Sequence, residues 1–345
     1  MATTYKTFLN NDRVATRTLL HESIPITGTM VSGTYSDKNV KSYAHGMFQS
    51  VYDYPYLSSS ANHIFDITFG YHSDSALSGT NPAQNSKKVN IYNQMAQVLM
   101  GYNSASVIQK FDADGNILGG GTKHTACYFL NFARLLTKDE IKKGSFSISY
   151  KASGSWTTAD SAAPGSGSHT LTDSGAENSF KVNSPAGEYG ILKNAAGNQK
   201  GLIFYQAGMI AMTSSIMSGS TTFKTGSAIR SGSFAELYTS GTIDEIANNF
   251  RRRLIKLSFN NTTELNSSIY FCRVNHNDFN YSSNPTYVSS SKIVVKNSTM
   301  DNPVTYITSV GLYSSDNELL ATAKLSEPLK KTPENEMTLR VRLDY

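Results

Sequence analysis

The sequence predicts a mainly β protein, built from sandwich-like antiparallel sheets with two or three short helices. Hydrophobic residues make up 39% and charged residues 17% of the 345 residues, which is below the roughly 45–50% and 25% of ordinary globular domains. Polar hydroxyl and amide residues take their place, together with 20 tyrosines and 16 phenylalanines. Such residues favour pleated surfaces and turns over long helices. Many short segments also alternate apolar and polar residues, which is typical of half-buried strands.

The charge and the cysteine content narrow the class of protein. The formal net charge is +5, and the basic residues are spread along the chain except in the triplet 251–253. Nucleic-acid binders usually gather their basic residues on one face, so no specific nucleic-acid partner is expected. Cys127 and Cys272 each lie in an apolar, strand-like context. We expect both thiols to be reduced and buried.

Targeting and membrane signals are not found in the sequence. The first 18 residues lack the apolar core of a signal peptide. No run of about 18 apolar residues predicts a membrane span. We therefore expect the chain to fold in a cytoplasm, without a membrane partner.

The first 71 residues predict an extended segment and then a buried strand. Residues 1–30 are rich in threonine and include Pro25, which indicates an extended N-terminal arm with one or two strands. The arm either docks on a neighbouring molecule or forms an edge strand of its own fold. Residues 47–71 are dense in aromatic side chains, and the stretch 64–69 is typical of a buried strand or short helix. Core packing or a flat aromatic docking surface would explain this density.

Three local patterns follow between residues 91 and 144. Apolar residues from Ile91 to Tyr102 recur at helical spacing, and Gly101 marks the predicted end of that helix. The segment 107–118 predicts a hairpin that turns at Asp114 and Gly115. Thr137 and Glu140 have the spacing of a capping box, which predicts a short helix over 136–144.

A change of composition at residues 151–185 predicts the domain boundary. Phe146, Ile148 and Tyr150 alternate with serines and predict a half-buried strand. The following 151–185 are small, polar and rich in glycine and serine, which predicts a long loop or an excursion from the sheet that Trp156 would hold in place. We therefore expect a β-rich domain over 1–150, with the N-terminal arm, and a β-sandwich-like domain over 186–345.

The second half of the sequence is dominated by strand patterns. Residues 188–215 predict a three-stranded meander with a turn at Ala196–Asn198. Thr242 and Glu245 form a capping box for a helix over 241–256, with acidic residues at its start and the arginine triplet at its end, as the helix dipole favours. Further strands are expected up to the C-terminus, with a turn at Asp316–Asn317. The alternating last strand is expected to close a sheet.

A search for chemistry gives no candidate catalytic, cofactor-binding or metal-binding residue. The histidines have neither HxxxH spacing nor a neighbouring CxxC, and each is expected to be exposed or hydrogen-bonded; they are His21, His45, His63, His72, His124, His169 and His276. The glycines at 119–121 lack the order of a phosphate-binding loop, and residues 112–115 are typical of a hairpin turn rather than a calcium loop. The sequence therefore predicts a protein that is not an enzyme and holds no cofactor.

The arginine triplet leaves two further interpretations open besides the helix dipole. Arg251, Arg252 and Arg253 form either a salt bridge to another subunit or a nucleic-acid contact. An acid pair that meets in space, as in glycan-cleaving enzymes, leaves no signature in a sequence. Acidic residues are, however, sparse in the predicted strands.

Several segments resemble virion structural proteins of contractile-tailed, T-even-like bacteriophages, such as those of marine cyanobacteria. They are spread over roughly a third of the chain, at 7–29, 51–71, 201–215, 269–288 and 305–331. The last of them, with GLY, DNELLA and KLSEP in order, is similar to a strand-turn-strand unit of tail-fibre and baseplate proteins. The resemblance implies a non-enzymatic tail subunit in the virion, most of all a wedge-type baseplate component that assembles with copies of itself and with other tail proteins, including tail fibres. A receptor- or glycan-binding attachment protein of the tail fibre, a neck protein and a glycan-cleaving enzyme are the alternatives.

Overall fold

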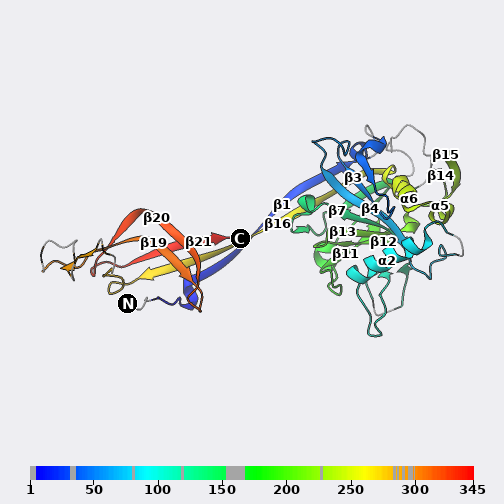
Figure 1. Cartoon of the computed structure of the whole chain (residues 1–345). Coiled ribbons are helices and arrows are strands. Elements are labelled where there is room, and N and C mark those ends of the chain that lie inside the picture. Colours follow the sequence, from blue (N-terminus) through cyan, green and yellow to red (C-terminus); the bar gives the residue numbers. More distant parts are fainter. Residues whose placement is uncertain are drawn as a thin grey trace. The chain divides into compact units, whose positions relative to one another are not determined.

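The computed structural model describes residues 5–31, 36–79, 82–117, 120–152, 168–225, 228–282, 285, 287–289, 292–293, 298 and 300–345. Strands predominate in the order of elements (Figure 1). The strands are β1 (Arg13–Thr27), β2 (Val40–Ser42), β3 (Gln49–Tyr52), β4 (His63–Tyr71), β5 (Phe111–Asp112), β6 (Lys123–His124), β7 (Ala126–Phe132), β8 (Glu140–Ile141), β9 (Ser147–Lys151), β10 (Ser168–Thr172), β11 (Tyr189–Asn194), β12 (Gln199–Phe204), β13 (Met209–Thr213), β14 (Ser220–Thr225), β15 (Ala228–Ser233), β16 (Leu254–Val274), β17 (Val288–Ser289), β18 (Lys292–Ile293), β19 (Thr305–Tyr313), β20 (Leu319–Lys331) and β21 (Met337–Asp344).

Helices are few and short. The described residues form the α-helices α1 (Gly28–Val31), α2 (Asn85–Leu99), α3 (Arg134–Thr137), α4 (Ala176–Ser179), α5 (Phe234–Ser240) and α6 (Ile243–Arg251), and the 3-10 turns η1 (Asn10–Asp12), η2 (Ser36–Asn39) and η3 (Ser214–Ile216). Within that part of the chain, α2, α5 and α6 alone exceed four residues. The predicted mainly β class, with sandwich-like antiparallel sheets and few helices, is confirmed.

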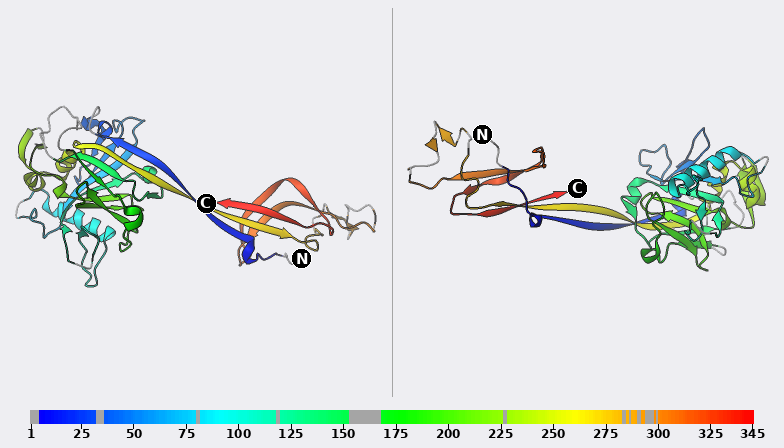
Figure 2. Two further views of the ribbon diagram at one scale, coloured as in Figure 1. Left: turned by 180° about the vertical axis from the view of Figure 1, so that it is seen from behind. Right: turned by 90° about the horizontal axis from the view of Figure 1, so that it is seen from below.

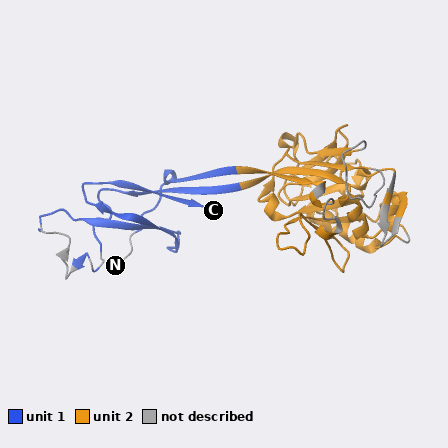
Figure 3. Ribbon diagram, turned by 90° about the horizontal axis from the view of Figure 1, so that it is seen from above, with its two compact units in different colours: residues 1–19, 264–345 blue, residues 20–263 orange. Residues whose placement is uncertain are grey.

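The chain divides into two compact units (Figure 3). We call residues 20–263 the central unit and residues 1–19 with 264–345 the terminal unit. β1 and β16 are strands of both units, because each crosses the boundary in sequence. The predicted boundary inside 151–185 therefore differs from the division that the structure shows.

Strand pairing explains why the boundary does not fall at 151–185. β10 lies inside this stretch and pairs with β9 before it, with Lys151 opposite Ser168, and with β11 after it, with Leu171 opposite Asn194. Chain on both sides of the stretch is thus part of one sheet. Residues 153–167, including Trp156, lie outside the described residues. The expected role of Trp156 remains a prediction.

The sheet of the central unit runs in the order β16-β9-β10-β11-β12-β13-β7-β4-β3-β2, with β8 also beside β16. The pairs along this path are antiparallel. β11, β12 and β13 form the predicted meander, and Gly197 has a positive φ of 79° in its first turn. The strand predicted around Ile148 is β9, and the segment 64–69, for which a buried strand or a short helix was expected, is part of strand β4.

The core lies on both faces of this sheet. Along β7, Tyr128 and Leu130 contribute to one apolar cluster, and Cys127 and Phe129 to the other. Helix α2 covers the second face, and α5 and α6 cover the first (Figures 1 and 2). Because both faces are buried, central strands contain continuous apolar runs instead of strict alternation.

Helix α2 confirms the helix expected near residue 91, with a different buried face. It begins at Asn85 and ends at Leu99, just before Gly101, which has a φ of 76°. Ile91 and Leu99 are buried as predicted, but Val98 is 63% exposed. The stripe that contacts the sheet also includes Lys88, whose ammonium group donates to the carbonyls of the α5 end. A buried lysine cannot be recognised from hydrophobic periodicity alone.

Two local predictions between residues 107 and 144 are wrong. The hairpin predicted over 107–118 turns at Asp114–Gly115. In the structure β5 pairs with β6, with Phe111 opposite His124, so a longer connection joins the two strands. The predicted helix over 136–144 is absent from this described segment: α3 ends at Thr137, and β8 follows. Ile141 is fully buried and pairs with β16, so packing against the sheet overrides the capping pattern.

The capping box of α6 is confirmed. The Thr242 hydroxyl accepts from the Glu245 amide at 3.3 Å, and the Glu245 carboxylate accepts from the Thr242 amide at 2.8 Å. These bonds satisfy two of the amides that a helix start leaves without partners.

Replacing Thr242 with alanine is expected to lower the free energy of unfolding by about 1 kcal/mol, because the Glu245 amide loses its acceptor. Urea denaturation gives the measurement. Thr242→Ser is the matched control, because serine keeps the accepting hydroxyl. It should lower the free energy of unfolding by only a few tenths of a kcal/mol. Equal losses in the two variants would show that the hydroxyl is not the stabilising group.

The terminal unit contains the C-terminal strands. β21 pairs with β16, and Val341 faces inward between exposed arginines, as the alternating pattern predicts. β19 and β20 form a hairpin whose turn contains Asn317, with a φ of 64°. The predicted turn at Asp316–Asn317 is thereby confirmed. The N-terminal segment joins this unit through η1 and β1.

Candidate docking pocket

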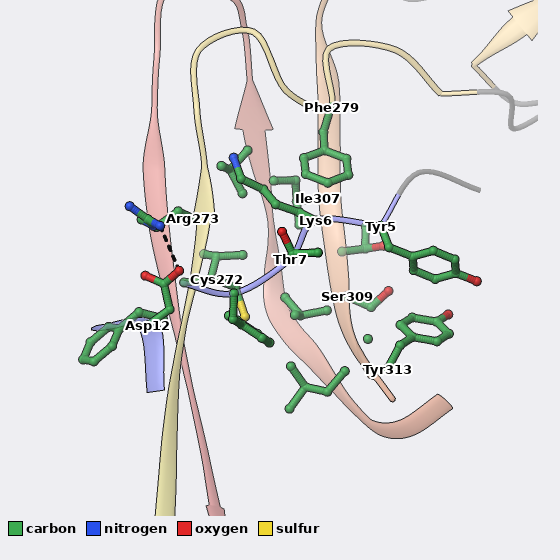
Figure 4. A pocket seen from close by; sticks show the side chains of 18 of the residues that line it. Tyr5, Lys6, Thr7, Asp12, Cys272, Arg273, Phe279, Ile307, Ser309 and Tyr313 are labelled. Carbon is green, nitrogen blue, oxygen red and sulfur yellow. Dashed lines mark hydrogen bonds and ion pairs between the residues drawn. The ribbon is translucent and has the colours of Figure 1, made fainter. Parts of the chain in front are cut away.

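A pocket of about 650 Å³ lies in the terminal unit (Figure 4). Its walls come from the N-terminal residues 5–8, the end of β16, the loop after β16, and β19. Apolar and aromatic side chains predominate among the lining residues, which also include a few hydroxyl groups and the ion pair of Asp12 with Arg273. We call this hollow the arm pocket and residues 5–9 the arm, of which residues 5–8 line one side of the pocket.

Side chains hold the arm against its pocket. The ring of Tyr5 contacts the ring of Tyr313 edge-on, with centroids 4.8 Å apart. Lys6 forms an ion pair with Asp278, which holds the pKa of the Asp278 carboxyl below its usual range. Phe8 packs against Tyr270 with ring centroids 5.5 Å apart. Among the described residues, no backbone hydrogen bond joins the arm to a strand.

A tight turn fixes the direction of the arm. The Asp12 carboxylate accepts from the Leu9 amide at 2.7 Å, and the Asp12 amide donates to the Leu9 carbonyl at 2.9 Å. Arg273 on β16 contacts the same carboxylate at 2.8 Å. The Leu9 amide and Arg273 hold the pKa of Asp12 below its usual range. Through its ion pair with Arg273, Asp12 therefore connects the turn after the arm to β16.

Another wall is a loop held in place by a buried lysine. Lys331 is fully buried and donates to the His276 carbonyl at 3.0 Å and to the Asn280 side chain at 2.8 Å. The Thr305 hydroxyl donates to the Phe279 carbonyl at 2.6 Å. These bonds fix the loop whose Phe279 ring faces the pocket (Figure 4).

The Cys272 thiol in the wall of the arm pocket is not activated as a nucleophile. Cys272 is a free, half-buried thiol in its wall. Burial and the negative charge of Asp12 raise the pKa of Cys272, whereas a nucleophilic cysteine needs a lowered pKa. Cys127, the other free thiol, is fully buried as predicted. In the described part of the chain, no group of three histidine, cysteine or acidic side chains is placed to hold a metal ion.

Sequence reasoning does not identify these pocket residues. The extended arm is expected from the sequence, but its pocket is formed by residues from both ends of the chain. The one indication available was the aromatic content of the N-terminal and C-terminal segments. Tyr54 and Tyr56 of the aromatic segment at 47–71 are partly exposed and belong to the central unit.

The arginine triplet belongs to the core. Arg251 is fully buried and donates to the Asn248 side chain at 2.6 Å, and Arg252 and Arg253 are at most 7% exposed. The guanidinium of Arg253 lies 5.2 Å from the centre of the Phe234 ring. The triplet therefore offers no basic surface for a nucleic acid.

His124 departs from the expectation that the histidines are exposed or hydrogen-bonded. It is 5% exposed on β6, and its Nε2 atom has no hydrogen-bond partner among the described residues. Burial, with a smaller contribution from Lys200, lowers the pKa of His124 to about 4.

Acid is expected to destabilise the central unit through His124. The unfolded side chain takes up a proton near pH 6.5, but the folded one does so only near pH 4. The unfolded state thus binds more protons between these values, and the free energy of unfolding should fall by about 3 kcal/mol as the pH drops from 6.5 to 4. Urea denaturation at several pH values measures this slope. His124→Leu should flatten the slope, and a slope unchanged by this substitution would contradict the assignment.

Comparisons with known proteins give no match, whether with family models, with curated proteins or with solved structures. No helix formed by the described residues is long and apolar enough to span a membrane.

Proposed function

We propose that this chain is a non-enzymatic structural subunit of a bacteriophage tail, a wedge-type baseplate component that assembles with other tail proteins. The observation that carries the proposal is the arm pocket. It offers a preformed apolar surface that suits an extended protein segment, and its wall at Cys272 lacks an activated nucleophile. The resemblance of the sequence to virion structural proteins adds the location in a virion tail.

Exposed apolar side chains of the terminal unit support a role in assembly. Tyr313 on β19 and Leu319 on β20 lie opposite each other and are 42% and 53% exposed, and the neighbouring Leu320 is 69% exposed. Contiguous exposed apolar surface commonly marks a protein–protein interface. β19 pairs only with β20 in the part of the chain that the structure describes, so its second edge is available to a strand of a neighbour.

Analysis of virus particles tests this proposal. Mass spectrometry of purified particles of the encoding virus should detect the chain in a fixed ratio to the other tail proteins. Antibodies against the recombinant chain should label the base of the tail in immunogold electron microscopy. Label at the neck would replace the baseplate assignment with a neck protein. Absence of the chain from particles would overturn the structural role.

A receptor- or glycan-binding role is the second candidate. It is favoured by the aromatic side chains in the wall of the arm pocket, among them Tyr281, Tyr306 and Tyr313, since aromatic faces pack well on sugar rings. The assembly role is preferred, because the arm already covers part of the pocket and its charged groups pair with one another. Binding of the chain to a glycan array, lost in Tyr313→Ala, would support the second candidate instead.

A further inference from the structure

We infer that the arm is an exchangeable segment: the arm of one copy binds in the arm pocket of a second copy of this chain. The inference rests on the proposed function in that it treats the chain as an assembling subunit, and it names the partner and the segment. The terminal unit already offers a surface that fits this sequence, because the arm contacts Tyr313, Tyr270 and Asp278 around the pocket within the same chain. The contacts that the arm makes within its own chain can form with the same geometry between the arm of one copy and the pocket of another.

The contacts of the arm are of a kind that exchanges easily. Two ring contacts and one ion pair hold it, and no backbone ladder among the described residues must be broken to release it. The arm is also incompletely covered, since Tyr5 and Phe8 are each 41% exposed and Leu9 is 59% exposed. A bound arm that leaves its apolar side chains in water gains from further cover by a second molecule.

The turn at residues 9–12 acts as the hinge. Asp12 closes this turn through the Leu9 amide and joins it to Arg273. With the turn closed, the arm reaches the pocket of its own chain. With the turn extended, the arm and β1 form one continuous extended segment that reaches away from that pocket. The Asp12 contacts therefore set the balance between the two arrangements.

The ion pair of the arm provides a test by charge reversal. Lys6→Glu places two negative charges at the pair in one chain, and Asp278→Lys places two positive charges there in another. Each variant alone disfavours its own arm, whether that arm binds within the chain or in an identical copy. When the two variants are mixed, a reciprocal exchange restores both ion pairs. In the mixed dimer, the arm with Lys6→Glu binds at the site with Asp278→Lys, and their charges are opposite. The arm that keeps Lys6 binds at the site that keeps Asp278.

Native mass spectrometry of the equimolar mixture separates the mixed dimer from the two homodimers, because the variants differ in mass. We expect the ratio of the mixed dimer to the two homodimers together to exceed its statistical value by roughly fivefold to tenfold, because two exposed ion pairs replace two repulsions. The chain carrying both substitutions should associate like the unsubstituted chain. A mixture with only the statistical share, or with no dimer at all, would overturn the inference.

Deletion of residues 2–9 gives an independent measurement that does not depend on charge. Sedimentation of the full chain over a range of concentrations should show reversible association, and the shortened chain should remain monomeric. Association unchanged by the deletion would overturn the inference. Such a failure would be distinguishable from failure of the proposed function, since a chain that does not exchange arms would still be found in tail particles with other proteins.

Discussion

Replacing Asp173 with alanine is expected to lower the free energy of unfolding of the central unit by about 3–5 kcal/mol, because three buried donors lose their acceptor. The carboxylate is fully buried and accepts from the Gly144 amide at 2.8 Å, the Phe146 amide at 2.9 Å and the Tyr205 hydroxyl at 3.0 Å. Burial raises the pKa of Asp173, and these hydrogen bonds oppose that rise. The residue connects the chain before β9 with the end of β10 and with the residue that follows β12.

Two further variants separate lost hydrogen bonds from lost volume. Asp173→Asn keeps the shape and one acceptor, so it should lose less than alanine but more than about 1 kcal/mol, since the amide nitrogen then faces at least one donor. Glu236→Ala removes an exposed carboxylate from α5 and should change stability by less than about 1 kcal/mol. The measurement is urea denaturation with pulsed hydrogen exchange of β4 and β7 amides, which report the central unit alone. A loss in Asp173→Ala no larger than in Glu236→Ala would contradict the role of the buried carboxylate.

Replacing Gly70 with alanine is expected to destabilise the central unit by about 3 kcal/mol, at the upper end of the usual cost of overpacking. A Cβ atom at Gly70 would lie 2.6 Å from the Lys88 carbonyl oxygen and 2.8 Å from the Tyr92 nitrogen. Both are backbone atoms of α2, so no side-chain rotation relieves the contact. Glycine at this position lets the helix lie directly on β4.

The position of α2 is what this substitution tests. Gly79→Ala is the matched control, because nothing lies within 4 Å of a Cβ atom there, and its effect should stay within about 0.5 kcal/mol. The same denaturation measurement applies. If Gly70→Ala were as mild as Gly79→Ala, the close approach of α2 to the sheet would be wrong.

Local patterns in the sequence determined the fold class and several elements. The capping box at Thr242, the meander of β11 to β13 and the alternating strand β21 were all predicted, because their causes lie within a few residues of each other. Hydrophobic periodicity also located α2 and β4. The sequence, with the resemblance it carries, is likewise the source of the proposal of a phage tail protein.

Only the tertiary structure decided the division of the chain and the place of the arm pocket. Strand pairing determines the two units, and the two ends of the chain belong to the same unit. The composition change at 151–185 does not predict this division, because β9 and β10 pair with each other within the central unit. Burial of Lys88, Asp173 and Arg251 depends on partners distant in sequence or on packing around them. Contacts such as those of Tyr5 with Tyr313 join residues about three hundred positions apart, and no local pattern encodes such a pair, since their proximity arises only when the whole chain has folded.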